Sequence, residues 1–282
     1  SNTATVLAFD FGASSGRAIR AVYDGQNLTY EEIHRFENVP IEKDGHLCWD
    51  VETLLKEIHT AIQKAGTFDS LGFDTWGVDF GLLDADGHLL ANPVHYRDVR
   101  TNGKPEQAAA CMPAEELYAH TGNQIMAINT LFQLLALQEQ EPELLQKAEQ
   151  ILFMPDLFAA LLGAEPVCER SIASTSQMLD PRTGQWSREV LTAYGLKENH
   201  FAPLVASGTV TGTLTTGAKI IAVAGHDTQC ASAAMPCAEE DAEHTAFLSC
   251  GTWSLLGTEL DTPILTADSC QSGLSNELGA NG

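Results

Sequence analysis

Four short segments combine carboxylates with small or aromatic residues, and the first suits phosphate chemistry. Residues 10–17 read Asp-Phe-Gly-Ala-Ser-Ser-Gly-Arg, an acid at the end of a β-rich run followed by a turn. Gly and Ser let backbone N–H groups and hydroxyls approach phosphate oxygens closely. Asp10 offers the oxygen ligands that suit Mg²⁺, usually through water. The segment matches neither the GxxxxGK[ST] nor the GxGxxG pattern. An ordinary hairpin turn explains this segment alone equally well.

The second segment, residues 72–79, suits sugar binding. It reads Gly-Phe-Asp-Thr-Trp-Gly-Val-Asp. Strand alternation predicts that Asp74, Trp76 and Val78 share one face and that Asp79 lies on the other. Carboxylates accept hydrogen bonds from sugar hydroxyls, and an indole covers an apolar sugar face. A strand end with solvated acids is the simpler interpretation when the segment is considered alone.

The third and fourth segments place an acid and a second small turn later in the chain. Asp227 follows a predicted strand and begins a predicted helix. Asp is a common helix N-cap, but ligand sites of α/β proteins also lie at the carboxyl ends of strands, where Asp227 could act as a general base. His226 either orients a hydroxyl or is an ordinary surface histidine. Residues 249–254 form another turn of Ser, Gly and Thr, and two such turns could hold one phosphate chain from two sides.

Composition excludes several classes of protein. The 282 residues include 38 Asp and Glu against 15 Lys and Arg, a net charge of −23. Such a charge repels nucleic-acid phosphates, so we expect no nucleic-acid partner. We find no apolar run of bilayer length and no export leader, so we expect no membrane association. Seven Cys, an odd number without zinc-site spacing, indicate reduced thiols and a cytoplasmic location.

Hydrophobic periodicity predicts an α/β fold around these segments. Strands are expected over 5–11, 17–23 and 28–35 as an antiparallel meander, then over 70–76, 78–84, 89–96, 220–224, 244–249 and 253–260. Helices are expected over 51–64, 131–140, 142–148, 155–162 and 227–234. Residues 164–219 are rich in loops. Strands followed by a helix and further strands are the α/β order.

Taken together and in this order, the segments resemble the FGGY family of carbohydrate kinases. The resemblance runs from about Val6 to the end of the chain and is closest to the members that phosphorylate L-rhamnulose. Its motifs are residues 10–17, 33–36, 49–50, 74–80, 96–98, 100–103, 129–130, 133–134, 153–158, 226–228, 249 and 251–254. It implies a ribonuclease-H-like, actin-like ATPase fold with two domains. It also implies transfer of the γ-phosphoryl group of ATP, with Mg²⁺, to a ketose, here the 1-hydroxyl of L-rhamnulose.

The resemblance also assigns roles to individual residues. Asp227 is the proton acceptor, and Asp10 lies near Mg²⁺. The sugar contacts are Gly77, His226, Asp227 and Thr228, with Asp79 and Asn129 as weaker candidates. The ATP phosphates are bound by Ala13, Ser14, Ser15, Gly16, Arg17 and Thr252.

Family members are longer than this chain, which affects the expected domains. We interpret residues 1–2 as a remnant of expression, 3–243 as the N-terminal sugar-binding domain and 244–282 as the beginning of a truncated ATP-binding domain. Negligible turnover by the chain alone and self-association through residues 244–260 are therefore expected. Three alternatives stay open: a kinase for xylulose, fuculose or glycerol; a non-catalytic sugar-binding module; and an actin-like structural or chaperone ATPase.

Overall fold

The core of the protein is a mixed six-stranded sheet. The computed structural model describes residues 3–234, 246–250 and 253–282. Strands β1 (Ala4–Phe11), β2 (Ser15–Tyr23) and β3 (Leu28–Glu37) form the predicted antiparallel meander. Strand β6 (Ser70–Asp74) pairs in parallel with β1, and β14 (Lys219–Ala222) pairs in parallel with β6. Strand β13 (Thr209–Thr213) completes the order β13-β14-β6-β1-β2-β3.

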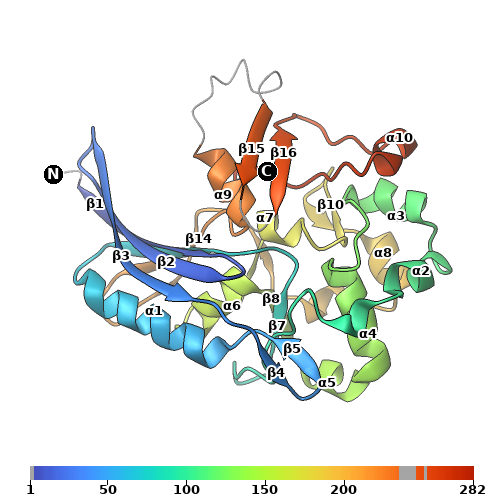
Figure 1. Cartoon of the computed structure of the whole chain (residues 1–282), viewed down its shortest axis with the longest axis horizontal. Helices are drawn as coiled ribbons and strands as arrows, with labels where there is room; N and C mark the ends of the chain where they lie inside the picture. Colours follow the sequence, from blue (N-terminus) through green and yellow to red (C-terminus); the bar gives the residue numbers. More distant parts are fainter. Residues whose placement is uncertain (1–2, 235–245, 251–252) are drawn as a thin grey trace.

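Alternate side chains along the strands point to opposite faces of this sheet, which makes one face apolar. Two helices cover that apolar face. Along β1, Leu7, Phe9 and Phe11 are buried, whereas Asp10 lies on the opposite face. Helix α1 (Val51–Ala65) packs its apolar stripe into the same core, close to the predicted range of 51–64. Helix α6 (Met154–Leu161) places Phe158 4.7 Å from Phe11, ring centroid to ring centroid. Figure 1 shows α1 lying along the sheet beside β3.

A helical region stands beside the sheet, on the side away from β1 (Figure 1). Its helices are η1 (Val99–Thr101), α2 (Lys104–Ala109), α3 (Ala114–Thr121), α4 (Thr130–Gln140), α5 (Pro142–Lys147), α7 (Arg170–Ala173), α8 (Arg188–Ala193) and η2 (Glu198–His200). Short strand pairs connect it: β4 (Ile41–Lys43) with β5 (His46–Cys48), β7 (Phe80–Leu83) with β8 (Gln150–Phe153), β9 (Cys168–Glu169) with β12 (Leu204–Val205), and β10 (Leu179–Asp180) with β11 (Gln185–Trp186).

The last part of the chain returns to the sheet and to the helical region. Helix α9 (Asp227–Ala233) begins after β14, and the hairpin of β15 (Ala246–Cys250) and β16 (Ser254–Thr258) follows. Helix α10 (Ala267–Gln271) then packs beside α3, where Tyr118 Oη donates to Ser269 Oγ across 3.0 Å. Backbone N–H of Asn276 donates to the carbonyl of Gly122 across 2.7 Å. Residues 264–278 are therefore joined to the first half of the chain by hydrogen bonds.

Two sequence predictions about strands are wrong. Residues 89–96 form no strand but make isolated bridges, because Pro93 cannot donate to a ladder and the segment crosses between β5 and β7. Strand β6 ends at Asp74, and Val78 has a positive φ of 63°, so strict alternation does not extend from Asp74 to Asp79.

Among the described helices, none has both the length and the apolar character needed to cross a bilayer.

Candidate functional site

A cavity of about 570 Å³ gathers most of the residues singled out in the sequence. It opens between the β1–β2 turn, residues 76–78, the loop 123–129, the start of α9 and the β15–β16 hairpin. The predicted residues that line it are Asp10, Ala13, Ser14, Ser15, Gly16, Arg17, Gly77, Asn129, His226, Asp227 and Thr228. Segments from the beginning, the middle and the last part of the chain thus face one space, which is the arrangement that a two-substrate site needs.

Asp227 lies at the cavity wall, and backbone pairing fixes its position. Its N–H donates to the carbonyl of Thr75 across 2.8 Å, and Thr75 N–H donates to the carbonyl of Gly225 across 2.9 Å. Asp227 is the first residue of α9, and the N–H groups of Gln229 and Cys230 donate to the carbonyl of His226, the residue before it. The Asp227 side chain accepts from one N–H of the first turn, that of Thr228. Its capping contact is therefore limited to the neighbouring residue.

The two carboxylate oxygens of Asp227 have different surroundings. Oδ1 accepts from the backbone N–H of Thr228 at 2.8 Å and from its Oγ1 at 3.4 Å, and His226 Nε2 lies 3.4 Å away. Among the described residues, none donates to Oδ2. Burial raises the pKa of Asp227, whereas His226 and the Thr228 N–H lower it. A raised pKa makes the carboxylate a stronger base than an ordinary aspartate.

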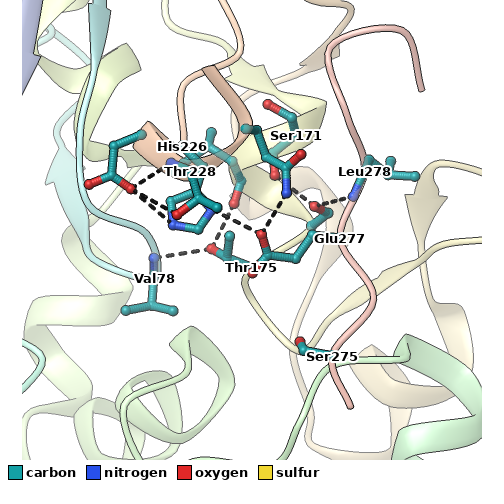
Figure 2. A network of polar contacts seen from close by, with 12 residues as sticks. Val78, Ser171, Thr175, His226, Thr228, Ser275, Glu277 and Leu278 are labelled. Atoms are coloured by element: carbon teal, nitrogen blue, oxygen red, sulfur yellow. Dashed lines mark hydrogen bonds and ion pairs between the residues drawn. The ribbon is translucent and has the colours of Figure 1, made fainter. Parts of the chain in front are cut away.

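His226 lies between two carboxylates, as Figure 2 shows for its contact with Glu277. Its Nδ1 is 2.9 Å from Oε2 of Glu277, and its side chain is only 12% exposed. Gln229 Nε2 also donates to Oε2 of Glu277 across 3.0 Å. Burial lowers the pKa of His226, but Glu277 and Asp227 outweigh it and raise the pKa to about 9. The ring is therefore an imidazolium at neutral pH, with an N–H on each side.

The turn between β1 and β2 is a compact loop to which Asn38 donates two hydrogen bonds. Gly12 N–H donates to the carbonyl of Ser15 across 2.8 Å, and Asn38 Nδ2 donates to the carbonyl of Gly12 across 2.9 Å. Asn38 N–H donates to the carbonyl of Ser14 across 3.0 Å. A Cβ on Gly16 would overlap the ring of Phe36. The loop thus keeps its shape through Asn38 and through the absence of a side chain at Gly16.

Two acids, Asp10 and Asp74, lie near the loop and suit a divalent cation. Asp10 and Asp74 are register partners on the parallel strands β1 and β6, and Asp10 Oδ2 accepts from Arg17 Nε across 3.0 Å. Oδ1 of Asp74 is buried without a hydrogen-bond partner among the described residues. Burial raises the pKa of Asp74 well above its ordinary value, as do Asp10 and Asp227. Carboxylate oxygens are the ligands that Mg²⁺ prefers, so this donor set fits the predicted ion.

Residues 76–78 form the wall opposite Asn129. The left-handed backbone of Val78, unusual for a β-branched residue, is held by two hydroxyls. Thr175 Oγ1 accepts from Val78 N–H at 3.1 Å, and Thr130 Oγ1 donates to the Val78 carbonyl at 2.6 Å. Figure 2 shows Thr175 beside Val78, with its hydroxyl next to the Val78 N–H. These contacts turn Gly77 toward the cavity.

Asp79 lies behind this wall and does not line the cavity. It is 1% exposed and accepts four hydrogen bonds, from Trp49 Nε1, Trp76 Nε1, Gln133 Nε2 and the N–H of Tyr96. Burial raises its pKa to about 7, and the hydrogen bonds from Gln133 and Trp49 oppose that rise. Its oxygens hold the tryptophan pair, whose rings stack 3.9 Å apart, so the structure gives Asp79 an internal role instead of a free sugar contact.

Asn129 lines the cavity from the N-terminus of α4, although its side chain makes no cap there. Its Nδ2 donates to the carbonyl of Gln124 across 2.9 Å and to Gln177 Oε1 across 2.7 Å. Thr252, the predicted phosphate contact of the second turn, lies outside the described residues. Its neighbours Ser249, Cys250 and Trp253 line the cavity.

Sequence reasoning missed Glu277, Asn38 and Thr175. Each acts by supporting another residue, and none belongs to a motif with a recognisable spacing. Glu277 lies 50 residues beyond Asp227, so only the folded chain brings it to His226. The polar residues Ser275 and Asn276 just before it are the one signal near it, and such residues are common in loops.

Comparison with known proteins decides the family. The model of the FGGY family of carbohydrate kinases, N-terminal domain, matches residues 5–233. The chain belongs to the FGGY family of carbohydrate kinases. It is 41% identical over 289 aligned positions to a rhamnulokinase of Bacteroides thetaiotaomicron, an alignment that covers 98% of this chain and 59% of the relative. This FGGY chain therefore spans about three fifths of that relative's length.

Solved structures confirm the predicted α/β, ribonuclease-H-like, actin-like fold. A carbohydrate kinase from Novosphingobium aromaticivorans is 23% identical, with a TM-score of 0.77 over 95% of this chain and 58% of that chain. A ligand-bound xylulose kinase from Lactobacillus acidophilus is 17% identical, with a TM-score of 0.65 over 79% of this chain and 48% of that chain. At such identities the likeness establishes the fold of the FGGY chain and not its sugar.

Proposed function

We propose that this chain provides the sugar-binding part of a kinase that transfers the γ-phosphoryl group of ATP to the 1-hydroxyl of L-rhamnulose. The observation that carries the proposal is Asp227, which lines the cavity and whose Oδ2 has no donor among the described residues, while Oδ1 is held by Thr228 and His226. The rhamnulokinase relative supports the choice of sugar.

In the proposed reaction, Oδ2 of Asp227 accepts the proton of the sugar hydroxyl. The hydroxyl oxygen forms the new bond to the γ-phosphorus, the bond from that phosphorus to the β–γ bridging oxygen breaks, and ADP leaves. The reaction depends on positioning and charge neutralisation more than on covalent chemistry. Gly77, Asn129, His226 and Thr228 would position the sugar.

The nucleotide would approach from the β1–β2 turn. The proposed phosphate contacts are Ala13, Ser14, Ser15, Gly16, Arg17 and Thr252. Mg²⁺, when bound, would neutralise phosphate charge, and Asp10 is the residue that would hold it through water. The domain division at residue 243 belongs to this proposal. So does a cytoplasmic location, which the six described cysteines, all free thiols, suit.

A sugar panel tests the substrate. Calorimetry with this chain should show weak binding of L-rhamnulose and a higher melting temperature at high sugar concentration, because binding stabilises the folded state. L-fuculose, D-xylulose and glycerol are the comparison compounds. Tighter binding of any of these would replace L-rhamnulose as the substrate. Binding without phosphoryl transfer in the extended protein described next would indicate a non-catalytic module.

The base is tested with Asp227→Asn in the chain extended by the part of the Bacteroides relative that the alignment does not cover. Asn keeps the size but has no useful basicity. We expect kcat to fall by roughly 10²–10⁴-fold with little change in melting temperature. Near-normal kcat would show that Asp227 is not the base and would direct attention to Asp10 or Asp74.

A further inference from the structure

One unexplained contact at the cavity is a partly buried ion pair made by a residue outside the matched domain. Glu277 lies beyond residues 5–233, yet its Oε2 is 2.9 Å from Nδ1 of His226. Burial would raise the pKa of Glu277, but His226 and Gln229 hold it below its ordinary value, so the group is a carboxylate. Even a partly buried carboxylate is costly unless it is paired and hydrogen-bonded, as Glu277 is here.

The segment that carries Glu277 is fixed on both sides of that residue. Asn276 N–H and Nδ2 both donate to the carbonyl of Gly122, across 2.7 and 2.9 Å. Leu278 N–H donates to Ser174 Oγ across 2.8 Å. Figure 2 shows Ser275, Glu277 and Leu278 on the same segment of the chain. Fixed neighbours leave Glu277 little freedom. Its carboxylate therefore sets the orientation of the ring it contacts.

The ring orientation has a consequence for Asp227. Because Nδ1 faces Glu277, Nε2 is the ring nitrogen that lies 3.4 Å from Oδ1 of Asp227. His226 Nε2 and Thr228 both contact Oδ1 of Asp227, which leaves Oδ2 as the oxygen that can accept a proton. A ring turned over, or one lacking the Nδ1 contact, would lose this arrangement.

We propose that Glu277 is a positioning residue for the reaction: it orients His226, so that His226 holds Oδ1 of Asp227 and Oδ2 faces the sugar hydroxyl. The inference rests on the proposed function and deepens it. A second carboxylate thus acts on the base through the histidine, and it comes from a segment that the domain match does not include.

The test compares three forms of this chain: the parent, Glu277→Gln and the matched control Glu259→Gln. Glu259 is exposed beyond the end of β16 and outside the cavity lining, so its substitution makes the same change of charge without altering the cavity. NMR titration of the His226 ring is the first measurement. We expect an imidazolium at pH 7.5 in the parent and the control, and a pKa lower by about one pH unit or more in Glu277→Gln. His226→Gln assigns the signal.

Calorimetric affinity for the ketose that binds the parent is the second measurement. Loss of a charged hydrogen bond predicts binding about tenfold weaker in Glu277→Gln and unchanged in Glu259→Gln. A neutral His226 ring in the parent at pH 7.5 overturns the inference even if Glu277→Gln fails to fold. So does a lowered His226 pKa with unchanged ketose affinity, which would make Glu277 purely structural. A parent that binds no ketose refutes the proposed function, while the titration still decides whether Glu277 holds His226.

Discussion

At the scale of single residues, the site shows one side-chain type in two environments. Asp227 has one oxygen held by donors and one without a donor among the described residues, whereas Asp79 has both oxygens occupied by N–H groups of the core. The same carboxylate is thus available for proton transfer at one position and committed to structure at the other. Hydrogen-bond partners, more than residue type, separate a candidate base from an internal anchor.

The environment of Asp79 predicts a large effect on stability. Asp79→Asn replaces an acceptor oxygen by an NH₂ group that faces N–H donors, whichever way the amide is turned. We expect a loss of about 2–4 kcal/mol in unfolding free energy, typical of a broken buried polar network. Urea unfolding measures it. The control Asp86→Asn, on an exposed turn, should change stability by less than about 0.5 kcal/mol. Equal stability of the two variants would contradict the anchoring role.

Residues also mark the limit of what the sequence predicts. The acid and the Gly-Ser turn at 10–17, and Asp227 at the start of a helix, follow local patterns, and their elements were predicted correctly. The burial of Asp79 was not predicted, because the positive φ of Val78 breaks the alternation and depends on distant Thr130 and Thr175. Glu277 and Asn38 act through tertiary contacts, which no spacing in the sequence encodes.

At the scale of elements, the β1–β2 turn depends on its packing against β3. Phe36 of β3 is buried beneath Gly16, and its ring lies 5.3 Å from that of Phe11, centroid to centroid. The ring is therefore packed between Phe11 and the backbone of Gly16. The shape of the proposed phosphate loop is a consequence of this contact as well as of the hydrogen bonds of Asn38.

Gly16→Ala tests this dependence. The added methyl must displace Phe36, so we expect destabilisation of about 1–3 kcal/mol, the usual cost of overpacking. In the extended protein, the KM for ATP should rise more than the KM for the sugar. Phe36→Leu in the same chain should restore part of both losses by removing ring atoms. If the double variant is no better than Gly16→Ala alone, the Phe36 contact does not set the shape of the loop.

At the scale of the whole molecule, the β15–β16 hairpin has two unlike faces. Ser249 and its register partner Leu255 line the cavity. The next pair, Leu248 and Leu256, lies on the opposite face by strand alternation, and these side chains are 65% and 77% exposed. Figure 1 shows the hairpin at the edge of the molecule, beside α9. An exposed apolar pair on an open two-stranded hairpin favours association with another surface.

The net charge of −23 opposes that association, and the balance between the two predicts a dependence on salt. Repulsion between like-charged copies is screened within about 8 Å at 0.15 M salt and within about 3 Å at 1 M, whereas apolar attraction is not weakened. The apparent mass in sedimentation should therefore rise with both protein and salt concentration. The variant Leu248→Ser with Leu256→Ser should remain monomeric under the same conditions, because it removes the apolar pair and keeps the charge. A parent that sediments as a monomer at 1 M salt would show that these leucines do not drive self-association. Equal association of parent and variant would place the contact on another surface.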